Sequence, residues 1–141
     1  MTKKNYLIIG STALFFIITI IVILLLGNNN NSEDWTSDIL KSQSYQITME
    51  DCNGREKTLD NSTLTKLSEK WTNLSNNGPW TGDTTACYTK VTISYENGSI
   101  INTKEIVIVD NSSIALIVGN NTIYYTNASE VINYLNTLFI A

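Results

Sequence analysis

The chain offers few side chains that could carry out catalysis. It contains no histidine, which excludes the usual histidine zinc sites, Ser-His-Asp and Cys-His arrangements and histidine pH switches. Glu50 and Asp51 are adjacent carboxylates. Because neighbours on a strand point to opposite faces, they fit solvated charges at a strand end better than the paired carboxyl groups of a glycosidase. Asp83 and Asp110 are expected in loops, without a nearby partner that the sequence identifies. Taken together, these residues indicate no catalytic residue, no metal ligands and no cofactor.

The most distinctive candidate for binding is a loop predicted over residues 76–86, with the sequence NNGPWTGDTTA. It carries Trp80 and Asp83, and an exposed Trp on a loop is a common anchor in binding sites. Trp80 could stack on a sugar or on a side chain of a partner. Alternatively, it folds back and covers the edge of the sheet near a disulfide. The loop lacks the Lys and the following helix of a phosphate-binding loop.

Cys52 and Cys87 are the only cysteines of the chain. In a domain held outside the cytoplasm, two cysteines most simply form one disulfide. The C-x-x-C spacing of a redox pair is absent. We therefore predict a structural disulfide between these two residues.

Asparagine sequons are frequent in this chain. Glycosylation of all of them would give a heavily modified surface, provided that the host has the machinery. About four sequons are expected by chance from the Asn, Ser and Thr content, and some of these residues suit turns and helix caps. The candidate glycosylation sites are Asn30, Asn61, Asn73, Asn97, Asn111, Asn120 and Asn127.

An uncharged apolar segment at residues 6–26 is expected to anchor the chain. As a helix it would be about 31 Å long, which matches a hydrocarbon core of about 30 Å. A cleaved signal peptide is the alternative, but its apolar region is shorter and ends in a small-x-small site. Lys3 and Lys4 precede the span and acidic residues follow it, so the positive-inside rule places the N-terminus in the cytoplasm. We expect a single-pass protein of the cell membrane with its C-terminal domain outside.

The charge distribution limits the partners of that domain. After Lys4, the chain carries seven basic residues against thirteen acidic ones. A nucleic-acid partner usually needs a basic patch, so nucleic acid is excluded as a partner. The remaining expected partners are the lipid bilayer, through residues 6–26, and a protein or glycan outside the cell.

The chain divides into four expected parts: a cytoplasmic stub at 1–5, a transmembrane helix at 6–26, a flexible tether with a short juxtamembrane segment at 27–42, and an extracytoplasmic domain at 43–141. Trp35 in the third part has two interpretations. Trp is favoured at the membrane surface, but Trp35 could instead join Ile39 and Leu40 in a short helix that packs on the domain.

Hydrophobic patterns predict a small α+β domain. Alternation with period two indicates six strands, at residues 45–50, 56–59, 87–96, 100–109, 114–118 and 122–125. Leu64, Leu67, Trp71 and Leu74 recur at helical spacing and predict a helix after the second strand. A final helix is predicted from Val131, Leu135 and Leu138, with Asn127 and Glu130 as a capping box.

The predicted order of elements is therefore ββαββββα. A disulfide between the end of the first strand and the start of the third makes those two strands antiparallel neighbours. The first helix then crosses from the second strand to the third. The predicted sheet is mostly antiparallel, in the order 2-1-3-4-5-6, with two helices on one face.

The expected function follows mainly from what the sequence lacks. A membrane-anchored extracytoplasmic binding or protein-interaction module fits a chain with no catalytic signature. The alternatives are a cell-envelope hydrolase whose carboxylates are assembled only by folding, and an accessory subunit of a membrane complex.

Overall fold

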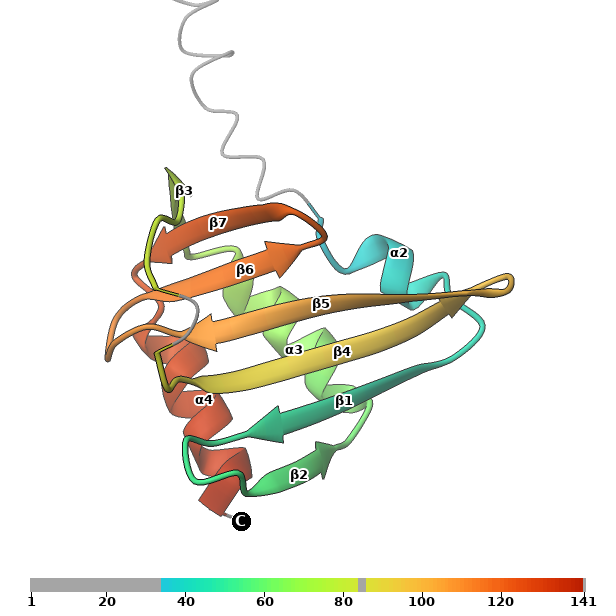
Figure 1. Cartoon of the computed structure of the whole chain (residues 1–141), viewed down its shortest axis with the longest axis horizontal. Helices are drawn as coiled ribbons and strands as arrows, with labels where there is room; N and C mark the ends of the chain where they lie inside the picture. Colours follow the sequence, from blue (N-terminus) through green and yellow to red (C-terminus); the bar gives the residue numbers. More distant parts are fainter. Residues whose placement is uncertain (1–33, 84–85, 141) are drawn as a thin grey trace, which may run out of the picture. The chain divides into compact units, whose positions relative to one another are not determined.

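A computed structural model describes residues 34–83 and 86–140, which form a small α+β domain (Figure 1). One antiparallel sheet has the strand order β2-β1-β4-β5-β6-β7-β3. Three helices accompany it. In chain order the elements are α2 (Ser37–Leu40), β1 (Tyr45–Glu50), β2 (Glu56–Leu59), α3 (Ser62–Trp71), β3 (Ser75–Pro79), β4 (Thr89–Asn97), β5 (Ile100–Ile108), β6 (Ile114–Val118), β7 (Asn121–Thr126) and α4 (Ser129–Ile140).

The six predicted strands and their order are confirmed, but the structure adds a seventh. β3, with the sequence SNNGP, pairs with the free edge of β7. Residues 76–79 were predicted to belong to a loop. The crossover prediction is also wrong, because α3 leads from β2 to β3 at the opposite edge of the sheet. The chain then returns from β3 to β4 in the middle.

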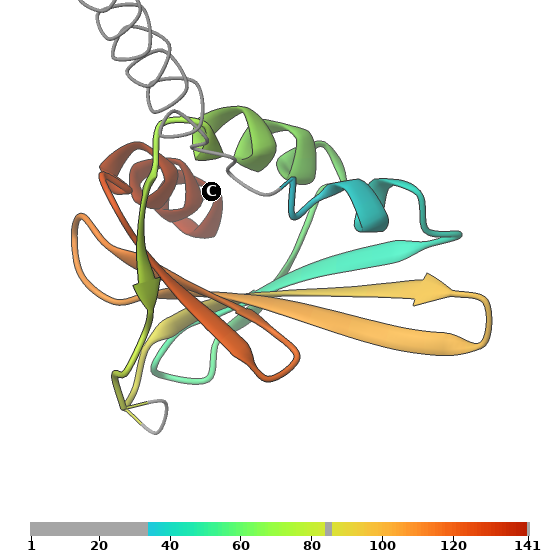
Figure 2. The same cartoon turned by 90° about the horizontal axis from the view of Figure 1, so that it is seen from above.

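All three helices lie on one face of the sheet (Figure 2). Alternate residues of the strands point toward them: Ile47 and Ile93 pair across β1 and β4, and both are fully buried. Thr48 and Thr92, one position further on, form the neighbouring pair on the opposite face. We call this opposite face the helix-free face.

Trp35 packs inside the domain, which confirms the second of its two interpretations. Its side chain is only 6% exposed, and its ring centroid lies 4.7 Å from that of Trp71 on α3. Ile39 of α2 is fully buried, whereas Leu40 is exposed and does not join this packing. The packing of Trp35, just before α2, and of Ile39 within it therefore holds this segment against the core.

The predicted disulfide is present. Cys52 and Cys87 are joined, with their Cα atoms 5.2 Å apart. Cys52 follows β1 and Cys87 precedes β4, and these strands are antiparallel neighbours as predicted.

The predicted capping box at the last helix is wrong. Asn127 has a φ of 60° and lies before the N-cap position, since α4 begins at Ser129. Its Nδ2 donates a hydrogen bond to Ser75 Oγ at 3.0 Å. Glu130 forms an ion pair with Lys70 of α3 at 2.6 Å. Asn127 therefore contacts the start of β3, Glu130 contacts α3, and the two side chains do not cap the start of α4.

No helix within residues 34–83 and 86–140 is long and apolar enough to span a membrane. The predicted span at residues 6–26 and the sequon at Asn30 lie outside the described residues.

Candidate functional site

Trp80 continues the pairing between β3 and β7. Within β3, Gly78 has a φ of 84° and donates its backbone N–H to Asn76 Oδ1 at 2.8 Å, so the strand bulges there. Beyond the bulge, the backbone N–H of Trp80 donates to the carbonyl oxygen of Thr122 at 3.1 Å. Thr122 belongs to the helix-free face, on which Trp80 therefore lies.

The indole ring of Trp80 is half-buried and held from two sides. Tyr88 meets it edge-on, with the ring centroids 5.8 Å apart. Gly82 lies so close that a Cβ atom at this position would overlap the indole ring. Only glycine therefore fits at position 82 beside the indole ring. The loop that carries Trp80 thus also sets the orientation of the Trp80 ring.

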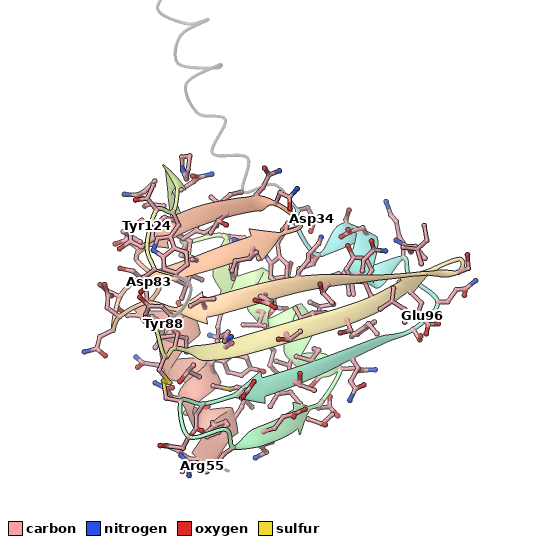
Figure 3. The ribbon with its side chains drawn as sticks, viewed as in Figure 1. Asp34, Arg55, Asp83, Tyr88, Glu96 and Tyr124 are labelled. Carbon is pink, nitrogen blue, oxygen red and sulfur yellow. A yellow bond between two sulfur atoms is a disulfide. The ribbon has the colours of Figure 1, made fainter. Side chains whose placement is uncertain are left out.

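Part of the helix-free face is buried near the segment that carries Trp80. Val107 and Ala115 are buried there although no helix lies over them. Residues 80–83, which follow β3, and residues 86–88, which precede β4, lie at this end of the sheet (Figures 1 and 2). Figure 3 shows Asp83, Tyr88 and Tyr124 gathered at the same end. Trp80 is half-buried and contacts Tyr88, the residue after Cys87, so its ring lies at the disulfide end of the sheet.

Trp80 lines a pocket of about 420 Å³, which we call the Trp80 pocket. None of the described residues that line it carries a charge. Asn residues come from β3, from the turn between β6 and β7 and from the start of β7. The lining residues are Asn76, Gly78, Pro79, Trp80, Asn120, Asn121, Thr122 and Ile123.

Asp83, the second predicted binding residue, does not belong to this lining. It is exposed on the loop, and its backbone oxygen accepts a hydrogen bond from the N–H of Ala86 at 3.3 Å. Of the two predicted residues, Trp80 lines this pocket and Asp83 does not.

A second pocket, of about 310 Å³, lies on the helix-covered side between α2 and strands β5 to β7. We call it the Lys104 pocket. The sequence did not predict it. Its lining residues are Asp34, Trp35, Ser37, Asp38, Lys104, Leu116, Val118, Asn121, Ile123 and Tyr125.

Lys104 is a charged residue on the apolar face of the sheet and is only 4% exposed. Its Nζ donates to the backbone oxygen of Trp35 and to Asp38 Oδ1. Tyr95 donates its hydroxyl to Asp38 Oδ2 at 2.7 Å. A buried Lys needs such partners, because an uncompensated charge away from water is costly.

The same contacts set the protonation of two groups. Burial raises the pKa of Asp38, but the hydrogen bonds from Lys104 and Tyr95 and the charge of Lys104 outweigh it, so the pKa is lowered from 3.8. Burial, together with the hydrogen bond to Asp38 and its negative charge, raises the pKa of Tyr95 to about 12. At neutral pH Asp38 is therefore a carboxylate and Tyr95 a hydrogen-bond donor.

The two pockets adjoin each other. Asn121 and Ile123, at the start of β7, line both of them. Both residues belong to the helix-facing set of β7, whereas Trp80 lies on the helix-free side, so the two pockets meet at the edge where the bulged strand β3 pairs with β7. The start of β7 is therefore a wall that the Trp80 pocket and the Lys104 pocket share.

The other carboxylates singled out in the sequence have structural roles. Desolvation raises the pKa of Asp51, but hydrogen bonds from the side chain and backbone of Arg55 and from the backbone of Asn53 outweigh it and bring the pKa to about 2. Asp110 accepts hydrogen bonds from Ser112 and Ser113 in its turn. Among the described residues, no group of three or more His, Cys, Asp or Glu could hold a metal ion.

No family model, curated protein or solved structure matches this chain. The function must therefore be argued from the geometry of the site.

Six of the seven sequons lie in the described residues, and the Asn of each is exposed. They differ in whether the side-chain nitrogen that would carry a glycan already donates a hydrogen bond. In Asn127 this nitrogen is engaged by Ser75, as described above.

Proposed function

We propose that the chain is a membrane-anchored extracytoplasmic binding module and that the Trp80 pocket is its binding site. The observation that carries this proposal is Trp80, a half-buried residue whose ring is held by Tyr88 and Gly82 and which lines an uncharged pocket. Binding sites are concave, lined by apolar and aromatic groups with a few well-placed polar ones. Trp is also enriched among residues that dominate binding energy.

The anchor and the topology belong to the same proposal. They rest on the uncharged segment at residues 6–26 and on Lys3 and Lys4 before it. A reporter enzyme that works only outside the cytoplasm, fused after Ala141, should be active. A native chain that begins downstream of Leu26 would show instead that the anchor is cleaved.

A hydrolase is the second candidate because Asp34 and Asp38 line one pocket. A glycosidase of this kind needs one carboxyl group that stays protonated as the general acid. Asp38 does not suit that role, since Lys104 and Tyr95 lower its pKa. Asp38 on α2 accepts hydrogen bonds from Tyr95 and Lys104 on the sheet, and these contacts favour a structural role over catalysis.

Site-specific photo-crosslinking in the native membrane tests the binding proposal. A photoreactive residue is placed at Thr81, which is exposed next to Trp80, and as a control at Glu69, which is exposed on α3. We expect the Thr81 position to capture a protein or polysaccharide that the Glu69 position does not. The capture should disappear when Trp80→Ala is added.

Identical products from both positions, or a Thr81 product that survives Trp80→Ala, would rule out the Trp80 pocket as the binding site. Absence of any specific product at Thr81 would do the same.

A further inference from the structure

We infer that the Trp80 pocket and the Lys104 pocket together bind a neutral oligosaccharide, with one sugar unit against Trp80 and the chain continuing past Asn121. This inference rests on the proposed function and names the chemical class of its ligand. It is carried by the aromatic wall, the amide groups, the distribution of charge and the wall that the two pockets share.

Trp80 supplies the first element of sugar recognition. A pyranose ring presents a face of C–H groups that packs against the flat face of an aromatic ring, whose π-system carries partial negative charge. Tyr88 and Gly82 fix the Trp80 ring before any ligand arrives. A fixed ring lowers the entropy lost on binding.

Amide side chains supply the second element. Asn120 lies in the turn between β6 and β7 and Asn121 begins β7, and each amide offers an acceptor oxygen and two donor hydrogens. Such a group can donate to one hydroxyl of a sugar and accept from the next. Asn76 uses its oxygen for the N–H of Gly78, which directs its NH₂ group to other acceptors.

Charge limits the class of sugar. The described lining of the Trp80 pocket contains no ionisable side chain. The Lys104 pocket contains Asp34 and Asp38 against Lys104 alone, and the part of the chain after Lys4 is strongly acidic. A uronic or sialic acid would meet repulsion in this field, whereas neutral hydroxyl groups can donate to the carboxylates.

The extent of the site follows from the two pockets. Their volumes are about 420 and 310 Å³, each near the lower end of the range for pockets that hold small ligands. Because Asn121 and Ile123 line both, we place the rest of the oligosaccharide around the start of β7, from the helix-free side at Trp80 to the helix-covered side at Lys104. An oligosaccharide should therefore bind more tightly than a disaccharide of the same sugar.

The test uses the full chain in nanodiscs of phosphatidylcholine and isothermal titration calorimetry. The probes are neutral tetrasaccharides of glucose, mannose and N-acetylglucosamine, the corresponding disaccharides, and tetragalacturonate as the acidic counterpart. We expect at least one neutral tetrasaccharide to bind, its disaccharide to bind more weakly, and tetragalacturonate not to bind.

Variants assign the binding to the site. Trp80→Ala should weaken it about tenfold or more, since tenfold corresponds to about 1.4 kcal/mol, the scale of one aromatic contact. Gly82→Ala should also weaken it, because the new Cβ displaces the indole ring. Tyr134→Ala, at a half-buried aromatic of α4 outside both pockets, should leave the affinity unchanged. Melting temperatures show that each variant is folded.

Three results would each overturn the inference: no binding of any neutral tetrasaccharide, equal binding of tetragalacturonate, or binding that Trp80→Ala does not weaken. The proposed function is judged separately by the cross-linking at Thr81. A protein captured there, with no sugar bound, would keep the binding module and refute the carbohydrate.

Discussion

Lys104 Nζ on β5 forms an ion pair with Asp38 Oδ1 on α2, 66 residues earlier in the chain. The ammonium is almost completely buried, whereas the carboxylate side chain is 44% exposed. This contact joins the segment through which the chain enters the domain to the middle of the sheet. It also forms one side of the Lys104 pocket.

Removing only the carboxylate should destabilise the domain more than removing the ammonium. Asp38→Asn leaves the buried charge of Lys104 without its ion-pair partner and should cost about 1–3 kcal/mol. Lys104→Met removes the buried charge and keeps an apolar chain of similar length, so the loss should be below about 1 kcal/mol. Urea unfolding measures both values. An equal or larger loss for Lys104→Met would show that the pair itself stabilises the fold.

The hydroxyl of Tyr95 should make the domain sensitive to alkali. Its pKa is raised from 10.0 to about 12 in the folded chain, so its contribution to stability is complete below pH 10 and is lost as the pH rises toward 12. Tyr95→Phe should remove this loss. The measurement is the urea midpoint as a function of pH. If Tyr95→Phe and the unaltered chain lose stability in parallel over this interval, Tyr95 is not the responsible group.

Much of the fold could be predicted because its strands alternate and its two cysteines define one pair of neighbours. β3 could not be, since SNNGP has no alternation and contains Pro and Gly; only the free edge of β7 makes it a strand. Trp80 was a candidate from its loop alone. Lys104 was missed, although its position two residues before Ile106 on the apolar face was a usable signal. Its partner Asp38 depends on tertiary packing.

The disulfide should contribute strongly to stability. It closes a segment with a sequence separation of 35, which corresponds to about 3–4 kcal/mol in the chain-entropy model. The variant with Cys52→Ala and Cys87→Ala should therefore melt more than about 10 °C lower, at roughly 4–8 °C per kcal/mol. Thiol labelling of the unfolded, unreduced chain should find no free cysteine. Full labelling of both would refute the pairing.

If the host glycosylates this chain, Asn127 should be modified less than Asn97. Its Nδ2, the atom that would carry the glycan, donates to Ser75 Oγ. Asn97 is the matched comparison, because it is exposed at the end of β4, next to the turn into β5. Peptide mass spectrometry gives the occupancy of each site. Higher occupancy at Asn127 than at Asn97 would show that this hydrogen bond gives no protection.

The role of Trp80 is tested most directly by comparing it with Trp71. Trp71 is 2% exposed in the core, so Trp71→Ala should cost about 3–5 kcal/mol, as for other buried aromatics. Trp80 is only half-buried, and Trp80→Ala should lower the melting temperature by less than half as much. The decisive measurement is the melting temperature of the two variants, together with capture by the photoreactive residue at Thr81 for Trp80→Ala. We expect Trp80→Ala to lose the captured partner while the domain stays folded. A fall in melting temperature equal to that of Trp71→Ala, or capture that persists, would show that Trp80 serves only the fold.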